Sequence, residues 1–318
     1  MTADVVEVVG PTAALTAAIS QARAYASQAT ADATRRAYTS DWRCFAEWCA
    51  GNGADPLPAA PETVGGYLAA RAQTLRTSTL ERRLAAIATA HRVAGHQLDT
   101  RHPAIRDVRR GIQRQHGSAQ RQAAAATVGL VKEMAGSCDG SLIGLRDRAL
   151  LLIGFAGAFR RAELVALKAE DMEEVPEGIR ITVRRSKGDQ AGEGQVVGIS
   201  RTGSETCPVD ALAAWRAAAG VAGGCLFRSI DRHGRIGGGL SDKAVALIVK
   251  RRAEDAGLDP QRFSGHSLRA GLATSAAAAG AEERDIQRQT RHRSVAVLRR
   301  YIRDGELFRD NVSGRVGL

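Results

Sequence analysis

The sequence predicts a mainly α-helical protein with a small β-sheet, in which an N-terminal helical bundle precedes a C-terminal mixed α/β domain. Its 318 residues exceed the usual size of one domain, so we expect two. Apolar residues recur at helical spacing in the first third of the chain. In the second domain, Ile179, Ile181 and Val183 instead alternate with polar residues, and a turn at residues 186–189 leads toward Val196, Val197 and Ile199, which indicates a β-hairpin.

Local composition divides the chain further. Residues 1–30 are rich in alanine with little periodicity, and we expect a loose or weakly helical N-terminal arm there. Residues 114–126 are polar and lack large apolar side chains, which is typical of a linker. We therefore expect the helical bundle over residues 31–113, the second domain over 127–305 and a C-terminal tail over 306–318.

Four helices are predicted in the bundle. The first has an apolar stripe at spacings of four, three and four residues, made by Tyr38, Trp42, Phe45 and Cys49. Pro61 suits the first turn of the second helix. The third is expected to open with a capping box that starts at Ser78, and the fourth begins at Pro103.

Six arginines lie on the predicted outer faces of the third and fourth helices: Arg82, Arg83, Arg106, Arg109, Arg110 and Arg114. Any one of them is more often a solubilising charge than a ligand. Asp107 is the only acidic residue between Arg101 and Gln122. As a set, these arginines are therefore expected to contact the phosphates of a nucleic acid.

The overall charge points to the same class of partner. The formal net charge is +11 and the sequence pI is about 10.1, which suits a polyanion. The five cysteines show no Cys-x-x-Cys pairing and are interpreted as free thiols of a reducing compartment. No basic leader is seen, and no apolar run reaches the roughly 18 residues that cross a bilayer. We expect no membrane partner and a cytoplasmic location.

A buried helix is predicted over residues 145–155, because Leu150-Leu151-Leu152-Ile153 is apolar on all sides. Arg160 follows it directly, so the core would position that arginine, as an active site requires. Glu163 has two readings that the sequence leaves open. It either holds Arg160 in a salt bridge or caps the next helix.

A group of cationic and nucleophilic side chains lies between residues 263 and 303: His266, Arg269, His292 and Tyr301. His266 and Arg269 are three residues apart, so both can reach one phosphate from a helical turn. His292 would be a further donor to that phosphate. A phenol with an ordinary pKa of about 10 needs cationic neighbours to act as a nucleophile. Seven arginines between Arg284 and Arg303 provide that setting.

Taken singly, each of these residues would more often be a surface charge or a packing residue. In order and spacing, they resemble the tyrosine recombinase (phage integrase) family. The matching features are Arg160 before Glu163-Leu164, Lys187 at the hairpin tip, His266-x-x-Arg269, His292 and, nine residues later, Tyr301. The catalytic half carries this resemblance strongly, the N-terminal half only in its architecture.

Two positions depart from the family pattern. Arg291 stands where many members have glycine before the second histidine, so the local turn is expected to differ. Arg160 is doubled by Arg161, and Glu163-Leu164 identifies Arg160 as the match.

The resemblance implies a tyrosine-recombinase catalytic domain and a site-specific DNA recombinase that works through a 3′-phosphotyrosyl intermediate and a Holliday junction. Tyr301 would attack the phosphate, while Arg160, Arg269, His266 and His292 stabilise the transition state. Lys187 would protonate the leaving 5′ oxygen, although a hairpin-tip lysine is usually just solvated. The bundle would grip one side of double-stranded DNA.

No cofactor is expected. The phosphotyrosine retains the energy of the broken bond, and the glycine-rich stretch 234–239 lacks the Gly-Lys-Ser/Thr of a nucleotide loop. The sequence also contains no His-Glu-x-x-His and no carboxylate cluster suited to metal ions.

Several alternatives stay open. The apolar residues of the tail would either fold back on their own domain or, as the resemblance implies, dock into a neighbouring subunit of a DNA-bound tetramer. A type IB topoisomerase-like enzyme would share this chemistry and relax DNA instead of recombining it. A non-catalytic, sequence-specific DNA-binding protein would bind without forming a covalent adduct.

Overall fold

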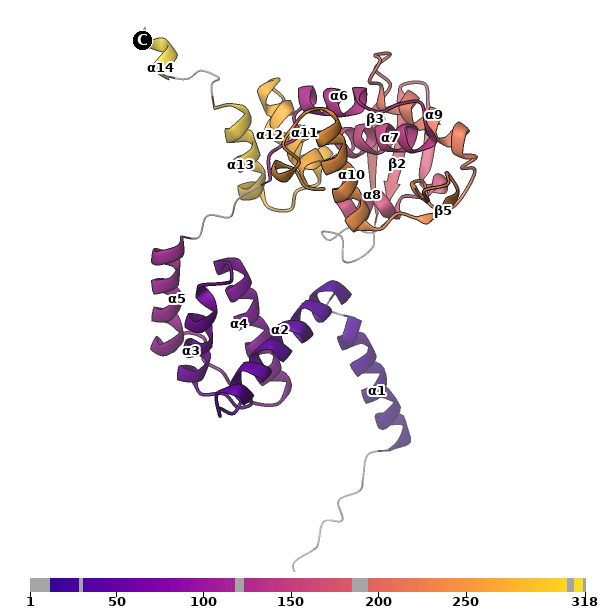
Figure 1. Cartoon of the computed structure of the whole chain (residues 1–318). Helices are drawn as coiled ribbons and strands as arrows, with labels where there is room; N and C mark the ends of the chain where they lie inside the picture. The colour runs from indigo at the N-terminus through magenta and orange to yellow at the C-terminus, as the bar shows by residue number, and fades with distance from the viewer. Residues whose placement is uncertain (1–11, 29–30, 118–122, 185–193, 308–311, 317–318) are drawn as a thin grey trace, which may run out of the picture. The chain divides into compact units, whose positions relative to one another are not determined.

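The structure is a computed structural model that describes residues 12–28, 31–117, 123–184, 194–307 and 312–316 (Figure 1). The chain forms two compact units, Met1–Arg121 and Gln122–Leu318. Each unit has its own hydrophobic core. The predicted fold class is confirmed, because helices dominate both units and the sheets are small.

The first unit consists of helices in its described part: α1 (Ala13–Gln28), α2 (Asp32–Gly51), α3 (Pro61–Ala72), α4 (Thr77–Val93) and α5 (Pro103–His116). α2 packs on α4, and α3 packs on α5. The core between them includes Phe45, Tyr67 and Ile87, all fully buried. Trp42 packs on Phe45 and Trp48 on Tyr67, which is a core-packing role.

One local expectation needs correction. α4 begins at Thr77 after Arg76 in extended conformation, with no side-chain cap, so Ser78 lies inside the first turn and does not cap it. The segment 114–126, predicted as a linker, contains the boundary between the two units. At its described ends, α5 continues to His116, and the amide of Ala126 donates to the carbonyl of Ser267 at 2.9 Å.

Nine further helices are named in the described part of the second unit: α6 (Val128–Gly136), α7 (Leu142–Ala156), α8 (Arg161–Ala166), α9 (Pro208–Ala219), α10 (Asp242–Asp255), α11 (Ser267–Ala278), α12 (Glu283–Thr290), α13 (Val295–Gly305) and α14 (Val312–Arg315). Two short 3₁₀ segments, Ala169–Asp171 and Pro260–Arg262, join some of them.

An antiparallel sheet of β1 (Met172–Val175), β2 (Gly178–Val183) and β3 (Gln195–Ser200) contains the predicted hairpin as β2 and β3. The alternation places Ile179, Ile181 and Val183 on one buried face. α7 and α9 contribute to the same core, where Trp215 is fully buried. α7 is the buried helix that its apolar run predicts, because nine of its residues are buried.

α11 lies against two further clusters that join α6, α10, α12 and α13. At Gly271, a Cβ atom would come within 1.7 Å of the Ala126 carbonyl oxygen, so only glycine allows this close approach. The glycine-rich stretch 234–239, expected as a loop, contains β5 (Ile236–Gly239), which pairs with β4 (Arg228–Ile230). Among the described residues, no helix combines the length and apolarity needed to cross a bilayer.

Candidate active site

Arg160 is positioned by the turn between α7 and α8. It precedes α8 in extended conformation, after Ala158, whose backbone is left-handed with φ of 46°. Glu163 accepts the Arg160 amide at 3.0 Å with one carboxylate oxygen and the Arg160 guanidinium with the other. Both readings of Glu163 are therefore correct: it caps α8 and also orients Arg160.

Burial alone would raise the pKa of the Glu163 carboxyl. Hydrogen bonds from Arg160 and the charge of Arg291 outweigh burial and lower that pKa below its ordinary value. Glu163 is therefore ionised at neutral pH although it is only 3% exposed.

Arg269 projects from the first turns of α11 and is only 1% exposed. Its Nη1 donates to the Ala158 carbonyl at 2.7 Å, whereas its Nε and Nη2 have no partner among the described residues. Burial and the charge of Arg160 lower the pKa of Arg269 to about 9, so the guanidinium is still charged at neutral pH. A buried cation with two unused donors requires an anion, and a phosphate satisfies that requirement.

His266 stands at the N-cap position of α11 without a side-chain capping bond, and the residue is exposed. Partial withdrawal from water and the neighbouring charges of Arg269 and Arg160 lower its pKa. His292 follows α12, and burial together with Arg269 and Arg160 lowers its pKa to about 3. Both imidazoles are therefore neutral at physiological pH in the unbound protein.

The tautomer of His292 is set by Thr290. The Thr290 hydroxyl donates to the Ile286 carbonyl at 2.7 Å, so it can only accept from Nδ1 of His292, which is also 2.7 Å away. The neutral ring then carries its proton on Nδ1. For Nε2 to donate to a phosphate, as the sequence predicts, His292 must gain a second proton.

Tyr301 lies on α13, and its ring centroid is 5.9 Å from that of His292. The ring packs against the small cluster that contains Ala273, Ile286 and Leu298. α13 packs on α11, which carries Arg269. The structure thus gathers Arg160, Arg269, both histidines and Tyr301 in one region. Lys187, the remaining predicted catalytic residue, lies outside the described residues.

Arg291 also belongs to this region, although the sequence presented it only as a departure from a glycine. It is left-handed with φ of 55°, and its side chain is 4% exposed. Its Nη2 donates to Glu163 Oε2 at 3.0 Å. The sequence did contain a signal for this role, because an arginine stands at a position where the backbone favours glycine.

Known proteins share this fold. The pattern of the Phage integrase family matches residues 129–306, more than half of the chain. The integrase/recombinase xerD homolog of Selenomonas ruminantium is 42% identical over 294 residues, 90% of this chain and 86% of that protein. The chain belongs to the phage integrase family. It is a tyrosine recombinase, an enzyme that breaks and rejoins DNA in site-specific recombination.

Other similar proteins agree. The tyrosine recombinase XerC of Syntrophus aciditrophicus is 32% identical over 174 residues, 50% of this chain and 49% of that protein. Two solved structures share the fold at a TM-score of 0.59. XerH bound to palindromic difH substrate is 16% identical over 80% of this chain and 71% of that one. A lambda integrase dimer bound to a COC′ core site is 14% identical over 93% and 82%. The segment Tyr301-Ile302-Arg303 that closes the catalytic motif, together with the two-domain length, also suggests a resemblance to the Cre recombinase. This more specific resemblance stays a prediction.

The six arginines expected to bind DNA are less free in the recombinase than their sequence suggests. Arg82 makes two hydrogen bonds to Asp41, at 2.7 and 3.1 Å, and Arg109 makes two to Glu81, at 2.9 and 2.6 Å. Arg106 pairs with Asp107 at 2.8 Å, and Arg110 is 4.0 Å from the same carboxylate. Arg114 is exposed on α5.

Arg83 needs correction, because its side chain is only 14% exposed and does not stand on an outer face. Its guanidinium bonds the Tyr67 hydroxyl, lies 5.8 Å from the Tyr67 ring centroid and is 3.6 Å from Asp41. These contacts indicate a packing role for Arg83.

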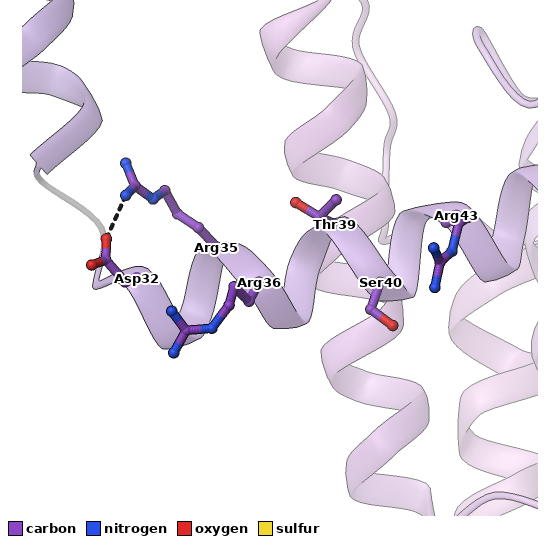
Figure 2. A pocket seen from close by; sticks show the side chains of 6 residues that line it. All are labelled: Asp32, Arg35, Arg36, Thr39, Ser40 and Arg43. Carbon is purple, nitrogen blue, oxygen red and sulfur yellow. Dashed lines mark hydrogen bonds and ion pairs between the residues drawn. The ribbon is translucent and has the colours of Figure 1, made fainter. Parts of the chain in front are cut away.

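A second basic face of the recombinase went unnoticed in the sequence. Arg36, Thr39, Ser40 and Arg43 are exposed on α2 and line a depression of about 590 Å³ (Figure 2). In the same depression Arg35 pairs with Asp32 (Figure 2). Arg43 is also 3.8 Å from Glu47, a residue one turn further along α2. The signal was present in the sequence, since these positions lie opposite the predicted apolar stripe of that helix.

Proposed function

We propose that Tyr301 is the nucleophile of this recombinase and that Arg160, Arg269, His266 and His292 stabilise the phosphorane-like transition state. The Tyr301 hydroxyl loses its proton to solvent, and its oxygen forms a bond to phosphorus while the bond to the 5′ oxygen breaks, which leaves a 3′-phosphotyrosyl link. Lys187 gives a proton to the departing 5′ oxygen. Attack by the 5′-hydroxyl of the partner strand reverses the step, and two rounds pass through a Holliday junction.

One observation carries this assignment: Arg269 is buried with Nε and Nη2 unpaired, beside Arg160 and a single carboxylate, Glu163. An active site that must stabilise extra negative charge on phosphate oxygens needs preorganised donors of this kind. His292 is consistent with it, because the negative charge of a phosphate would offset the arginine charges that lower the pKa of His292 in the unbound protein.

The partner in this proposal is double-stranded DNA. In the first unit, the exposed face of α2 with Arg36 and Arg43 contacts phosphates, with Arg114 of α5 as a further contact. The recombinase assembles as a tetramer on its DNA site. It acts in the cytoplasm.

The test uses a nicked suicide substrate from the protein's own genomic neighbourhood and a denaturing gel. We expect a covalent protein–DNA adduct with the wild type and none with Tyr301→Phe, which keeps the ring packing and removes only the hydroxyl. Tight binding without any adduct would contradict the proposal. An adduct on arbitrary DNA, accompanied by relaxation of supercoiled plasmid, would indicate topoisomerase-like activity instead.

A further inference from the structure

We infer that Arg291 is a positioning residue of the recombination site, which holds the turn that carries Arg160 and the carbonyl that anchors Arg269. This inference rests on the proposed function of those two arginines. It concerns a side chain that the family pattern does not provide, because many members have glycine at this place.

The backbone at Arg291 favours glycine. With φ of 55°, the residue ends α12 in the left-handed region, where a Cβ atom is unfavourable and glycine is not penalised. An arginine there is therefore maintained by what its side chain does. That side chain points into the protein and not into solvent, since only 4% of it is exposed.

The contacts of Arg291 converge on the turn between α7 and α8. Nη1 donates to the Gly157 carbonyl at 3.0 Å, and Nη2 donates to the Ala158 carbonyl at 3.3 Å. The guanidinium lies 5.1 Å from the ring centroid of Phe159. Three consecutive residues before Arg160 are thus held by one side chain.

Arg291 also touches the partner of each catalytic arginine. Glu163, which orients Arg160, receives a hydrogen bond from Arg291 on Oε2. The Ala158 carbonyl, which accepts from Arg269, accepts from Arg291 as well. Arg291 also contacts Arg160 directly through its backbone, because Nη2 of Arg160 donates to the Arg291 carbonyl at 3.4 Å.

The Glu163 carboxylate is held by two arginines, one on each of its oxygens. Glu163 binds the Arg160 guanidinium through Oε1 and the Arg291 guanidinium through Oε2, so the carboxylate cannot rotate freely. Without Arg291, Oε2 would keep only the Arg160 amide. Arg291 therefore fixes the direction in which Arg160 faces a phosphate.

The experiment compares the wild type with Arg291→Gly and Arg291→Lys, with Arg180→Ala as a control. Arg180 is an arginine of β2 whose side chain is 60% exposed and lies near Glu173. We measure the single-turnover rate of adduct formation, the Kd for the DNA site and the melting temperature. Arg291→Gly should slow adduct formation about tenfold to a hundredfold, because small misplacements of catalytic groups cost rates of this order.

The Kd of Arg291→Gly should change little. Its melting temperature should fall, because the buried hydrogen bonds to Glu163, Gly157 and Ala158 are lost although glycine suits the backbone, so rates are compared at a temperature at which every variant is folded. Arg291→Lys should recover part of the rate, because lysine keeps the charge and lacks the planar fork. In a Glu163→Gln background, Arg291→Gly should cost less than in the wild type, because the shared partner is already altered. Arg180→Ala should keep the wild-type adduct rate.

Two results would overturn the inference: a wild-type adduct rate in Arg291→Gly, or an equal loss in the Glu163→Gln background. NMR separates this inference from the proposed function. The side-chain Nε–H signals of Arg160 and Arg269 should shift in Arg291→Gly and stay in Arg180→Ala. If the wild type forms no adduct, the proposed function fails, while unshifted signals would still refute the role of Arg291.

Discussion

His292 shows how the environment of one residue sets its protonation. Burial and the surrounding charges of Arg269, Arg160, His266 and Arg291 hold its pKa at about 3, while an unfolded histidine has a pKa of about 6.5. The unfolded chain therefore binds more protons between those two values. Stability is complete above about pH 6.5 and falls as the pH decreases toward 3.

We expect the second unit to lose free energy of unfolding through His292 between pH 7 and pH 5, by less than about 2 kcal/mol, because each unit of pKa difference corresponds to about 1.4 kcal/mol and solvent screening reduces the effect for a half-buried imidazole. Denaturant unfolding of the wild type and His292→Gln at both pH values measures this loss. The variant should be less sensitive to pH by that amount. Replacing His233, an exposed histidine of the same unit, by glutamine should preserve the wild-type pH dependence. Equal pH dependence in wild type and His292→Gln would contradict the burial argument.

α2 illustrates a helix with two uses, since one face packs in the core through Phe45 and the other presents Arg36 and Arg43. We expect Arg36→Ala combined with Arg43→Ala to weaken binding of specific and arbitrary DNA alike. The slope of log binding constant against log salt should fall by about 2, one for each phosphate contact.

The matched control for α2 is Arg106→Ala, whose guanidinium makes two hydrogen bonds to Asp107, at 2.8 and 3.1 Å. It should reduce the salt slope by less than one. A larger effect of Arg106→Ala than of the α2 pair would return the DNA contact to the arginines predicted from the sequence.

Helices and the hairpin could be predicted from the sequence because their periodicity is local. The stripe of α2, the apolar run of α7 and the alternation of β2 and β3 each appear within a few residues. β4 and β5 could not be, because they are three and four residues long and β5 consists mostly of glycine.

The environment of the arginines depends on contacts between distant residues. Arg82 pairs with Asp41 across 41 positions and Arg109 with Glu81 across 28, so no local pattern shows their partners. Arg291 meets Glu163 across 128 positions. The order of the predicted catalytic residues could be taken from the sequence. Which of the arginine charges are neutralised by carboxylates depends on the folded structure.

At the scale of the molecule, the net charge overstates the number of arginines that are free to attract DNA, because many of them are paired with carboxylates. The chain carries +11, yet many guanidiniums are engaged by carboxylates, among them Arg146, Arg251 and Arg252 around the buried Asp147. These bonds link α7 to α10 and make that part of the basic charge structural. Attraction of DNA therefore depends on the exposed arginines and not on the total.

The tail carries the last prediction, which concerns assembly. Leu307, Val312 and Val316 are 61%, 70% and 64% exposed, an apolar set suited to docking on another subunit. We expect deletion of residues 306–318 to abolish cooperative binding of subunits to adjacent half-sites and to leave the affinity for a single half-site unchanged, because the proposed DNA contacts of α2 and α5 and the proposed catalytic residues all precede residue 306. Gel shifts on one and two half-sites measure both quantities.

Replacing Leu307, Val312 and Val316 by serine should reproduce the loss without shortening the chain. Val93→Ser removes a valine that is 82% exposed in the first unit and is the matched control, with cooperativity expected at the wild-type level. If the truncated protein still bound two half-sites cooperatively, the tail would instead fold back on its own domain. The three serine substitutions should then lower the melting temperature of the isolated subunit, because apolar side chains that are buried against their own domain contribute to its stability.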